Sequence, residues 1–216
     1  MLFSCSSYDA ESAPAPIGTA PVAGDAAKVV GRLDAEVSAQ DAATGAPDAA
    51  DANVVIAPRA TCDSARAVGA VHVYAQAVLD VIAFAEGTAG YGAYDGYNVL
   101  FGFSTVSSCA NHPNRVICKG SLCSTAAGRY QFLNRTWVGL ALPSFEPEYQ
   151  AQGAFTLVKQ RNVTLPMTRA LTATEFKSMM DKISYEWASI PPSRYGQPVR
   201  TASELRSLYC SKVTCA

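Results

Sequence analysis

From residue 61 to the end of the chain, apolar side chains recur at intervals of three and four residues. This spacing places them on one face of an α-helix. The clearest stripe predicts a helix of about 20 residues that begins at Asp63 or Ser64, either of which is a suitable N-cap, and ends at Gly87, a suitable C-terminal cap. Its apolar members are Val71, Ala75, Val78, Ile82 and Ala85.

The same periodicity predicts four further helices, at residues 124–142, 147–161, 173–188 and 202–209. Trp137 and Trp187 lie on two of these apolar stripes, so we expect both in the core. Between residues 88 and 123 the chain is rich in Gly, Ser, Asn and Tyr, which indicates loops or a small hairpin. The predicted fold is mainly α.

The first 60 residues have a different pattern. They contain 17 Ala, and their only aromatic residues are Phe3 and Tyr8. So few large side chains cannot offset the ~1–2 kcal/mol per residue of entropy that is lost when a backbone becomes ordered. We therefore predict a flexible tether at 1–60 and one folded domain at 61–216.

Charge divides along the same boundary. Residues 1–60 carry eight acidic and three basic side chains, whereas residues 61–216 carry ten acidic and fourteen basic ones. The net charge of −1 for all 216 residues argues against binding to nucleic acid through many phosphates. No apolar run reaches the ~18 residues that a membrane-spanning helix needs. The basic folded part suits an anionic polymer as its partner.

Seven cysteines occur, and six of them lie in the predicted domain. This pattern is typical of a disulfide framework and therefore of an oxidising compartment. The alternative is a zinc site, because two Cys pairs have the spacing Cys-x4-Cys. We predict disulfides and no metal, with one bridge between Cys210 and Cys215 and another within 109–123. The six residues are Cys62, Cys109, Cys118, Cys123, Cys210 and Cys215.

The seventh cysteine, Cys5, lies near the start of the chain. The run Leu2-Phe3-Ser4-Cys5 looks like the end of a bacterial lipoprotein signal, in which the Cys becomes acylated. The basic and apolar regions of such a signal are missing before it. A lipid anchor at Cys5 and a free cysteine therefore both stay open.

Glu86 is the strongest candidate for chemistry. It is the only acidic residue between Asp80 and Asp95, and its spacing from Leu79 and Ile82 places it on the apolar side of the first predicted helix, at its end. A carboxylate there loses hydration, which raises its pKa and suits it to deliver a proton near neutral pH. The alternative is a solvated carboxylate at a frayed helix end.

A loop rich in glycine and tyrosine follows Glu86 and includes Tyr97. Tyrosines beside glycines form open, flat surfaces on which sugar rings can lie. Gln131, just after Gly128, is suited to hydrogen-bond a sugar or its N-acetyl group. These residues indicate carbohydrate binding, and an ordinary irregular loop is the alternative.

Six groups of residues, in the same order along the chain, resemble motifs of the bacteriophage lambda endolysin family. They cover roughly residues 70–198. The resemblance implies a lysozyme-like α+β fold that acts as a peptidoglycan lytic transglycosylase. The motifs are Ala85-Glu86-Gly87-Thr88, Gly96-Tyr97-Asn98-Val99, His112-Pro113, Ser124-Thr125-Ala126-Ala127-Gly128-Arg129-Tyr130-Gln131, Leu165-Pro166-Met167, and Trp187-Ala188-Ser189-Ile190-Pro191 with Tyr195-Gly196-Gln197.

This resemblance also implies roles for single residues. Glu86 becomes the catalytic acid and base. From their own chemistry rather than from the resemblance, Arg129 is expected to hold either Glu86 or a substrate carboxylate, and His112 is expected to shape its loop. The cysteine-bearing insert around 109–123 departs from the family and is expected to reshape the cleft. Substrate-binding roles fall to Tyr130, Gln131, Gln150, Tyr195 and Gln197, beside Tyr97.

The count of carboxylates agrees with such an enzyme. A glycosidase of the usual kind needs two, about 5–9.5 Å apart, whereas a lytic transglycosylase needs one. We predict that Glu86 cleaves the bond between N-acetylmuramic acid and N-acetylglucosamine and yields a 1,6-anhydro sugar, without a cofactor. Three alternatives stay open: a hydrolytic muramidase that uses Glu86 and Asp95, a non-catalytic peptidoglycan-binding protein, and a disulfide-stabilised interaction domain.

The predicted partner is the glycan strand of peptidoglycan, bound by a monomer. The expected location is the cell envelope, as a periplasmic protein or an outer-membrane lipoprotein, or outside the cell. Contact with a membrane is expected only through Cys5.

Overall fold

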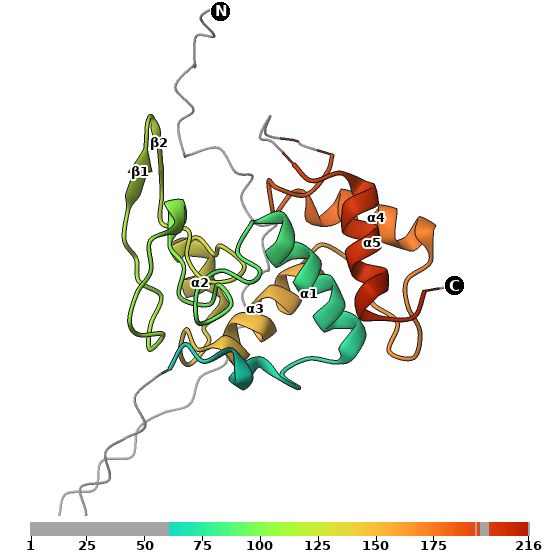
Figure 1. Ribbon diagram of the computed structural model, residues 1–216, viewed down its shortest axis with the longest axis horizontal. Helices are drawn as coiled ribbons and strands as arrows, with labels where there is room; N and C mark the ends of the chain where they lie inside the picture. The colour runs from blue at the N-terminus through green and yellow to red at the C-terminus, as the bar shows by residue number, and fades with distance from the viewer. Residues whose placement is uncertain (1–60, 193, 195–198, 216) are drawn as a thin grey trace, which may run out of the picture. The chain divides into compact units, whose positions relative to one another are not determined.

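A computed structural model describes residues 61–192, 194 and 199–215 (Figure 1). It confirms a mainly α fold with a small hairpin. The predicted tether 1–60 and Cys5 lie outside the described residues. Where the chain is described, no helix is long and apolar enough to cross a membrane. The elements are η1 (Ser64–Ala67), α1 (Val73–Ala85), η2 (Phe101–Phe103), β1 (Ile117–Lys119), β2 (Leu122–Ser124), α2 (Asn134–Leu140), α3 (Pro147–Gln160), α4 (Ala173–Ile183) and α5 (Ala202–Lys212).

Helix α1 forms the centre of the core. It packs against α3 and α5 (Figure 1), and Val78, Leu79 and Ile82 have no exposed surface. Trp137 and Trp187 are both buried, as predicted. The rings of Phe132, Trp137 and Phe145 meet edge to face, with centroids 4.7–4.9 Å apart for the two pairs that include Trp137.

The first predicted helix is interrupted. The 3₁₀ helix η1 is capped by Asp63, whose carboxylate accepts a 3.0 Å hydrogen bond from the Ala65 amide. Gly69 then takes a φ of +76°, and α1 begins only after His72, which caps it. Periodicity missed the break because Ala67, before it, still packs into the same core. The predicted end is confirmed, since Gly87 (φ +76°) follows the last turn.

The predicted helix at 124–142 is wrong over its first half. Instead, Ala127 and Phe132 exchange two backbone hydrogen bonds of 3.0 and 2.8 Å and close a tight turn, which we call the 127–132 turn. Gly128 and Gln131 both have positive φ there, which no α-helix tolerates. A side chain at position 128 would also collide with Gln150 and Phe145, so only glycine fits.

The three later helices follow the prediction, with shifted ends. Thr172 caps α4 and Thr201 caps α5, each in a reciprocal pair with the Glu three residues on. Helix α4 ends at Ile183 rather than at residue 188. Ser184 follows it and donates its hydroxyl to the Asp181 carbonyl, which offers the backbone an alternative to another helical turn.

All six cysteines of the described domain pair as disulfides: Cys62–Cys109, Cys118–Cys123 and Cys210–Cys215. Both predicted bridges are therefore confirmed, and zinc binding by these thiols is contradicted. Across the described residues, no cluster of three or more His, Cys, Asp or Glu side chains is placed to hold a metal ion.

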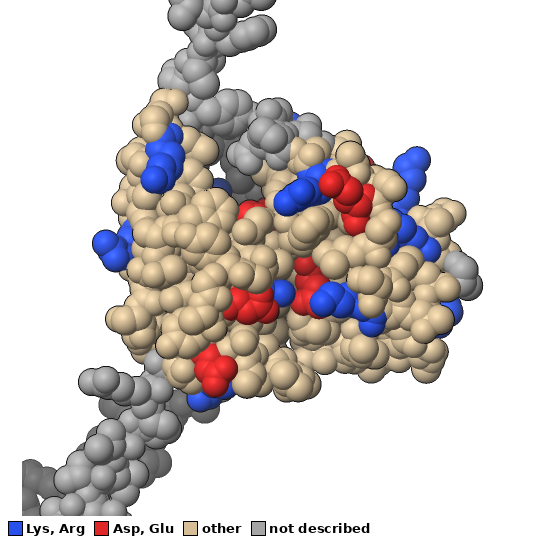
Figure 2. Space-filling view, viewed as in Figure 1, with Lys and Arg blue, Asp and Glu red and all other residues tan. Residues whose placement is uncertain are grey.

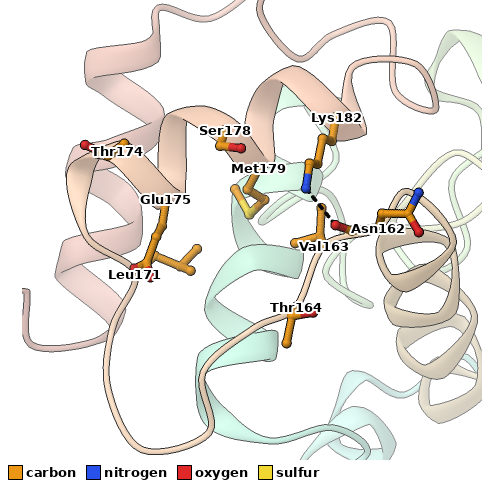
Figure 3. Close-up of a pocket in the computed structure, with 9 residues that line it drawn as sticks. All are labelled: Asn162, Val163, Thr164, Leu171, Thr174, Glu175, Ser178, Met179 and Lys182. Carbon is orange, nitrogen blue, oxygen red and sulfur yellow. Dashed lines mark hydrogen bonds between the residues drawn. The ribbon is translucent and has the colours of Figure 1, made fainter.

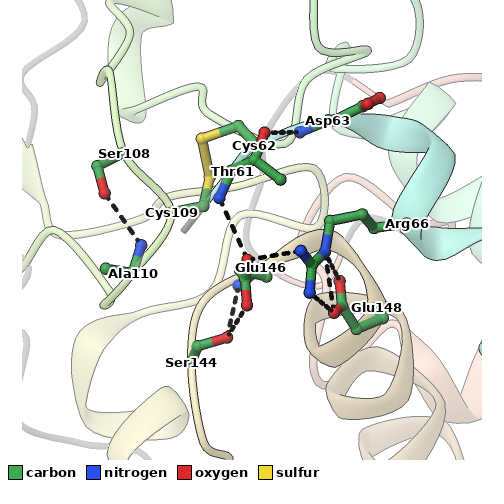
Figure 4. A network of polar contacts seen from close by, with 10 residues as sticks. All are labelled: Thr61, Cys62, Asp63, Arg66, Ser108, Cys109, Ala110, Ser144, Glu146 and Glu148. Atoms are coloured by element: carbon green, nitrogen blue, oxygen red, sulfur yellow. Dashed lines mark hydrogen bonds and ion pairs between the residues drawn. A yellow bond between two sulfur atoms is a disulfide. The ribbon is translucent and has the colours of Figure 1, made fainter. Parts of the chain in front are cut away.

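A polar network ties the start of the described chain to α3 (Figure 4). Arg66 of η1 makes two 3.0 Å hydrogen bonds from Nε to the Glu148 carboxylate and lies 3.2 Å from Glu146. The Thr61 amide donates to Glu146 at 3.2 Å, and Cys62 is bonded to Cys109 nearby. Residues 61–67 are thus fixed to the domain both covalently and by charge.

Candidate active site

Glu86 stands at the C-terminal end of α1. Its amide still donates to the Ile82 carbonyl at 2.9 Å, and Gly87 then turns the chain sharply away. The Glu86 side chain is partly buried, and its Oε1 accepts a 2.6 Å hydrogen bond from the Ser189 hydroxyl. The carboxyl group is therefore held in one orientation at the edge of the core.

Burial raises the pKa of Glu86 from 4.5 to about 7, and the hydrogen bond from Ser189 acts in the opposite direction. The partial negative charge at the end of α1 also disfavours the ionised form. A carboxyl group with a pKa near 7 exists in both states at neutral pH. It can therefore give a proton in one step and take one back in the next.

The segment that carries Ser189 is pinned to the 127–132 turn. Trp187 donates its indole N–H to the Tyr130 carbonyl at 3.0 Å, and Ile190 is fully buried. Ser189 itself is only 9% exposed. The site thus joins the end of α1 to the segment that follows α4. The 127–132 turn supports this segment through the hydrogen bond from Trp187.

Thr88 connects the residues after Glu86 to the 127–132 turn. It is completely buried, and its hydroxyl lies within hydrogen-bonding distance of the Ala83 and Arg129 carbonyls. Gly96 packs so closely on Thr88 that a side chain at position 96 would collide with it. The residues just after Glu86 are therefore locked to the 127–132 turn.

Gln150, a predicted substrate-binding residue, lies in the core with no exposed surface. Its Oε1 accepts from the Arg129 amide at 3.0 Å, and its Nε2 donates to the carbonyls of Tyr97 and Phe145 at 2.9 and 2.7 Å. A side chain so placed does not reach a ligand at the surface. Its role in this structure is to join α3 to the 127–132 turn and to the loop at Tyr97.

Tyr97 and Tyr130 are also placed in the core, at 2% and 0% exposure. Their hydroxyls lie 3.3 Å apart, and their rings meet edge to face. The direct sugar contact that we predicted for them does not fit this burial. Gln131 is partly exposed at the tip of the 127–132 turn, and its Nε2 donates a 2.9 Å hydrogen bond to the Gly128 carbonyl. The predicted residues Tyr195 and Gln197 lie outside the described residues.

Arg129 does not hold Glu86, contrary to one of its two predicted roles. Its guanidinium is buried against the Tyr97 ring and pairs with Asp95 at 2.5 Å and Asp80 at 3.2 Å. Figure 2 shows one face of the molecule, on which acidic and basic side chains lie next to one another. The Asp95 carboxylate also accepts from the Gly90 amide at 2.5 Å, so it is engaged in holding the loop.

His112 shapes its loop, as predicted. It is 8% exposed, its Nε2 lies 2.8 Å from the Phe132 carbonyl, and its Nδ1 accepts from the Asn114 amide at 3.1 Å. This pattern requires the proton on Nε2. Burial lowers the pKa of His112, which favours the neutral ring that this arrangement needs.

Sequence reasoning missed Ser189. The signal was present, because Ser189 belongs to the Trp187–Pro191 motif. Nothing in the spacing of that motif shows that its hydroxyl meets a carboxyl group 103 residues away. Only the folded chain brings the two residues together.

Two hollows of the surface lie elsewhere. One, of about 400 Å³, is bounded by α4 and the chain between residues 162 and 171, and Figure 3 shows Lys182 donating to the Asn162 carbonyl across it. The other lies over η1 and α1 beside Asp80 and Arg129. Glu86 lines neither of them, so neither contains the candidate catalytic group.

Comparisons with known proteins identify the family of the chain. A family model described as Endolysin matches residues 76–214. The endolysin of Escherichia phage lambda is 33% identical over 138 residues, which cover 60% of this chain and 85% of that protein.

Two solved structures are similar to the domain. Bacteriophage lambda lysozyme complexed with a chitohexasaccharide matches with a TM-score of 0.60 and 29% identity. Lysozyme from bacteriophage lambda matches with a TM-score of 0.57 and 28% identity. Each match covers 66% of this chain and 95% of the other. The family that the motifs predicted is confirmed, and the chain belongs to the endolysin family.

Proposed function

We propose that this chain cleaves the glycan strands of peptidoglycan as a lytic transglycosylase, with Glu86 as the acid and then the base. The proposal rests on the state of the Glu86 carboxyl group. The Glu86 carboxyl group is partly buried, is held by Ser189 at 2.6 Å and has a pKa raised to about 7. The family of the chain supports action on peptidoglycan, and the chemistry below adds the type of bond cleavage.

In the first step, protonated Glu86 donates its proton to the oxygen that links N-acetylmuramic acid to N-acetylglucosamine. The bond from that oxygen to the anomeric carbon breaks, and positive charge develops on the muramic acid ring. Ionised Glu86 then takes the proton of the 6-hydroxyl of the same sugar while that oxygen bonds to the anomeric carbon. The product is a 1,6-anhydro ring, no water is consumed, and Glu86 is protonated again.

The contacts of Asp80 and Asp95 favour this route over hydrolysis. A hydrolase needs a second carboxylate that is free to act as a nucleophile or to activate water. Asp95 is paired with Arg129 and bonded to the Gly90 amide, and Asp80 is paired with Arg129 and Lys212. Both carboxylates are thus engaged in contacts that stabilise the fold.

The substrate class follows from the relatives and from charge. A similar lysozyme was solved with a chitohexasaccharide, a chain of the same kind of amino sugar. Gln131 is partly exposed and its Nε2 donates to the Gly128 carbonyl, so it can offer its amide oxygen to the N–H of an N-acetyl group. The excess of basic residues in the folded part suits an anionic wall polymer. The cell envelope is the corresponding place of action.

The experiment is a digest of purified peptidoglycan by the full, oxidised chain and by Glu86→Gln, followed by mass spectrometry of the released muropeptides. We expect products that end in anhydro-muramic acid, and we expect them to disappear in the variant. Products one water heavier, with a reducing end, would show hydrolysis and reject the transglycosylase. A folded chain that binds the wall without releasing products would indicate a binding protein.

A further inference from the structure

Two exposed aromatic side chains contact each other close to Gly87, the residue that follows Glu86. Tyr91 is 36% exposed and Phe103 is 46% exposed. A Cβ atom added to Gly87 would lie 3.4 Å from the outer edge of the Phe103 ring. Because Gly87 directly follows Glu86, the Phe103 ring lies against the backbone next to the candidate catalytic residue.

The pair is held rigidly. The Tyr91 hydroxyl donates to the Phe103 carbonyl at 2.7 Å, and the two ring centroids lie 5.2 Å apart with their planes at 44°. An exposed pair fixed by its own hydrogen bond loses little conformational entropy when a ligand settles on it. This differs from the mobile aromatic side chain of an ordinary loop.

The backbone at Phe103 is unusual as well. Its φ of +69° lies in the left-handed region, which costs about 1–2 kcal/mol for a residue with a side chain. Glycine would take this conformation without strain, yet the chain carries a large ring there and exposes it. Strained backbone of this kind concentrates at functional sites.

The disulfide-closed hairpin contacts η2, the element that carries Phe103. The stem of Lys119 in β1 crosses Gly102 so closely that a side chain at position 102 would collide with it. The bridge between Cys118 and Cys123 closes the hairpin next to Lys119. The hairpin thus backs η2 and brings a positive charge to the edge of the aromatic surface.

We propose that Tyr91 and Phe103 form a saccharide-binding subsite, on which a sugar ring of the glycan strand stacks next to the bond that Glu86 cleaves. The C–H face of a pyranose ring is apolar and flat, and an exposed aromatic pair is complementary to it. Because Phe103 lies against the residue that follows Glu86, the ligand expected on the pair is a sugar of the substrate itself. The positive charge of Lys119 also suits an anionic glycan strand. The inference rests on the proposed function, because that function supplies the ligand.

The test measures binding of chitohexaose by calorimetry to the full chain carrying Glu86→Gln, so that the ligand stays intact. Phe103→Gly removes the ring and also relieves the left-handed strain, so it is not expected to unfold the protein. Phe103→Leu keeps apolar bulk without an aromatic face, and Phe103→Tyr keeps the face. Val138→Ala, at an exposed position of α2, is the control for surface truncation.

We expect Phe103→Gly and Phe103→Leu to weaken binding by about three- to tenfold, which is the size of effect typical of one aromatic contact. Phe103→Tyr and Val138→Ala should bind as the Glu86→Gln parent does. In the otherwise unchanged enzyme, Phe103→Gly should raise KM for peptidoglycan by a similar factor.

Binding by all variants within twofold of the parent would overturn the subsite, and so would a parent that does not bind chitohexaose. Loss with Gly but not with Leu would also overturn it, because apolar bulk alone would then explain the effect. The proposed function fails separately. If the unsubstituted chain releases no muropeptides while binding still depends on the Phe103 ring, the subsite stands and the lytic reaction is rejected.

Discussion

The Ser189 hydroxyl donates a 2.6 Å hydrogen bond to Oε1 of Glu86, across 103 residues of sequence. This bond favours the ionised carboxylate, whereas burial favours the neutral acid, and burial has the larger effect on the pKa. Ser189 therefore acts as a positioning residue with two effects. It fixes the orientation of the carboxyl group and limits how far the pKa of Glu86 rises.

Replacing Ser189 by Ala should shift the pH dependence of the enzyme. Protonated Glu86 is the form that donates a proton to the glycosidic oxygen, so activity falls as pH rises through its pKa of about 7. Without the Ser189 hydrogen bond that pKa rises, and the descending limb of kcat/KM moves to higher pH while kcat drops. Clearing of peptidoglycan suspensions between pH 5 and 9 measures both. Ser189→Thr, which keeps a hydroxyl, is the control, and an unmoved limb in Ser189→Ala would contradict this role.

Glu86 should also lower the stability of the folded state as the pH rises above neutral. Its pKa is raised on folding, so the folded state binds the proton more tightly, and stability is lost as pH rises from about 4.5 through about 7. Glu86→Gln removes this dependence and should be more stable than the wild type at pH 8, by up to about 3 kcal/mol, with little difference at pH 4.

Urea unfolding of the two proteins at both pH values tests this expectation. Equal stability at pH 8 would mean that ionised Glu86 is well solvated, which would weaken its assignment as the acid. The comparison needs no substrate, so it is independent of the type of bond cleavage.

Elements that depend on contacts between residues near in sequence were predictable, and elements that depend on contacts between distant residues were not. The later helices, α3 to α5, follow from local apolar spacing, and the caps Thr172 and Thr201 start two of them within a single turn. The 127–132 turn could not be predicted from apolar spacing, because it depends on the close tertiary contact between Gly128 and Gln150. Periodicity continued across it as if it were a helix.

The candidate site divides in the same way. The position of Glu86 at the end of α1 was predictable, since the end of an apolar stripe is local information, and its catalytic role stays a prediction. Whether a tyrosine faces solvent or the core is not local: Tyr97 is buried, whereas Tyr91, six residues earlier, is exposed. Composition alone marked the loop as a sugar-binding surface but did not identify which of its rings is exposed.

Gln150 provides a test of that distinction. Gln150→Leu leaves the Arg129 amide and the carbonyls of Tyr97 and Phe145 without their buried partner, which should lower the free energy of unfolding by about 3–5 kcal/mol. The matched control is Gln152→Leu on the exposed side of the same helix, with an expected change within about 0.5 kcal/mol. Unchanged stability together with a raised KM would instead restore the substrate-binding role.

Asp95→Asn separates the two glycosidase mechanisms. If Asp95 is a structural partner of Arg129, the variant loses only a partly exposed ion pair. It should then release the same muropeptides as the wild type, with activity within about tenfold. If Asp95 is the second carboxylate of a hydrolase, its loss should lower kcat by at least about a hundredfold, as removal of a catalytic group does. Mass spectrometry of the muropeptides, with Asp95→Glu as the charge-preserving control, distinguishes these results. Anhydro-muramic ends that persist in Asp95→Asn and vanish in Glu86→Gln would leave Glu86 as the one carboxyl group that the reaction needs.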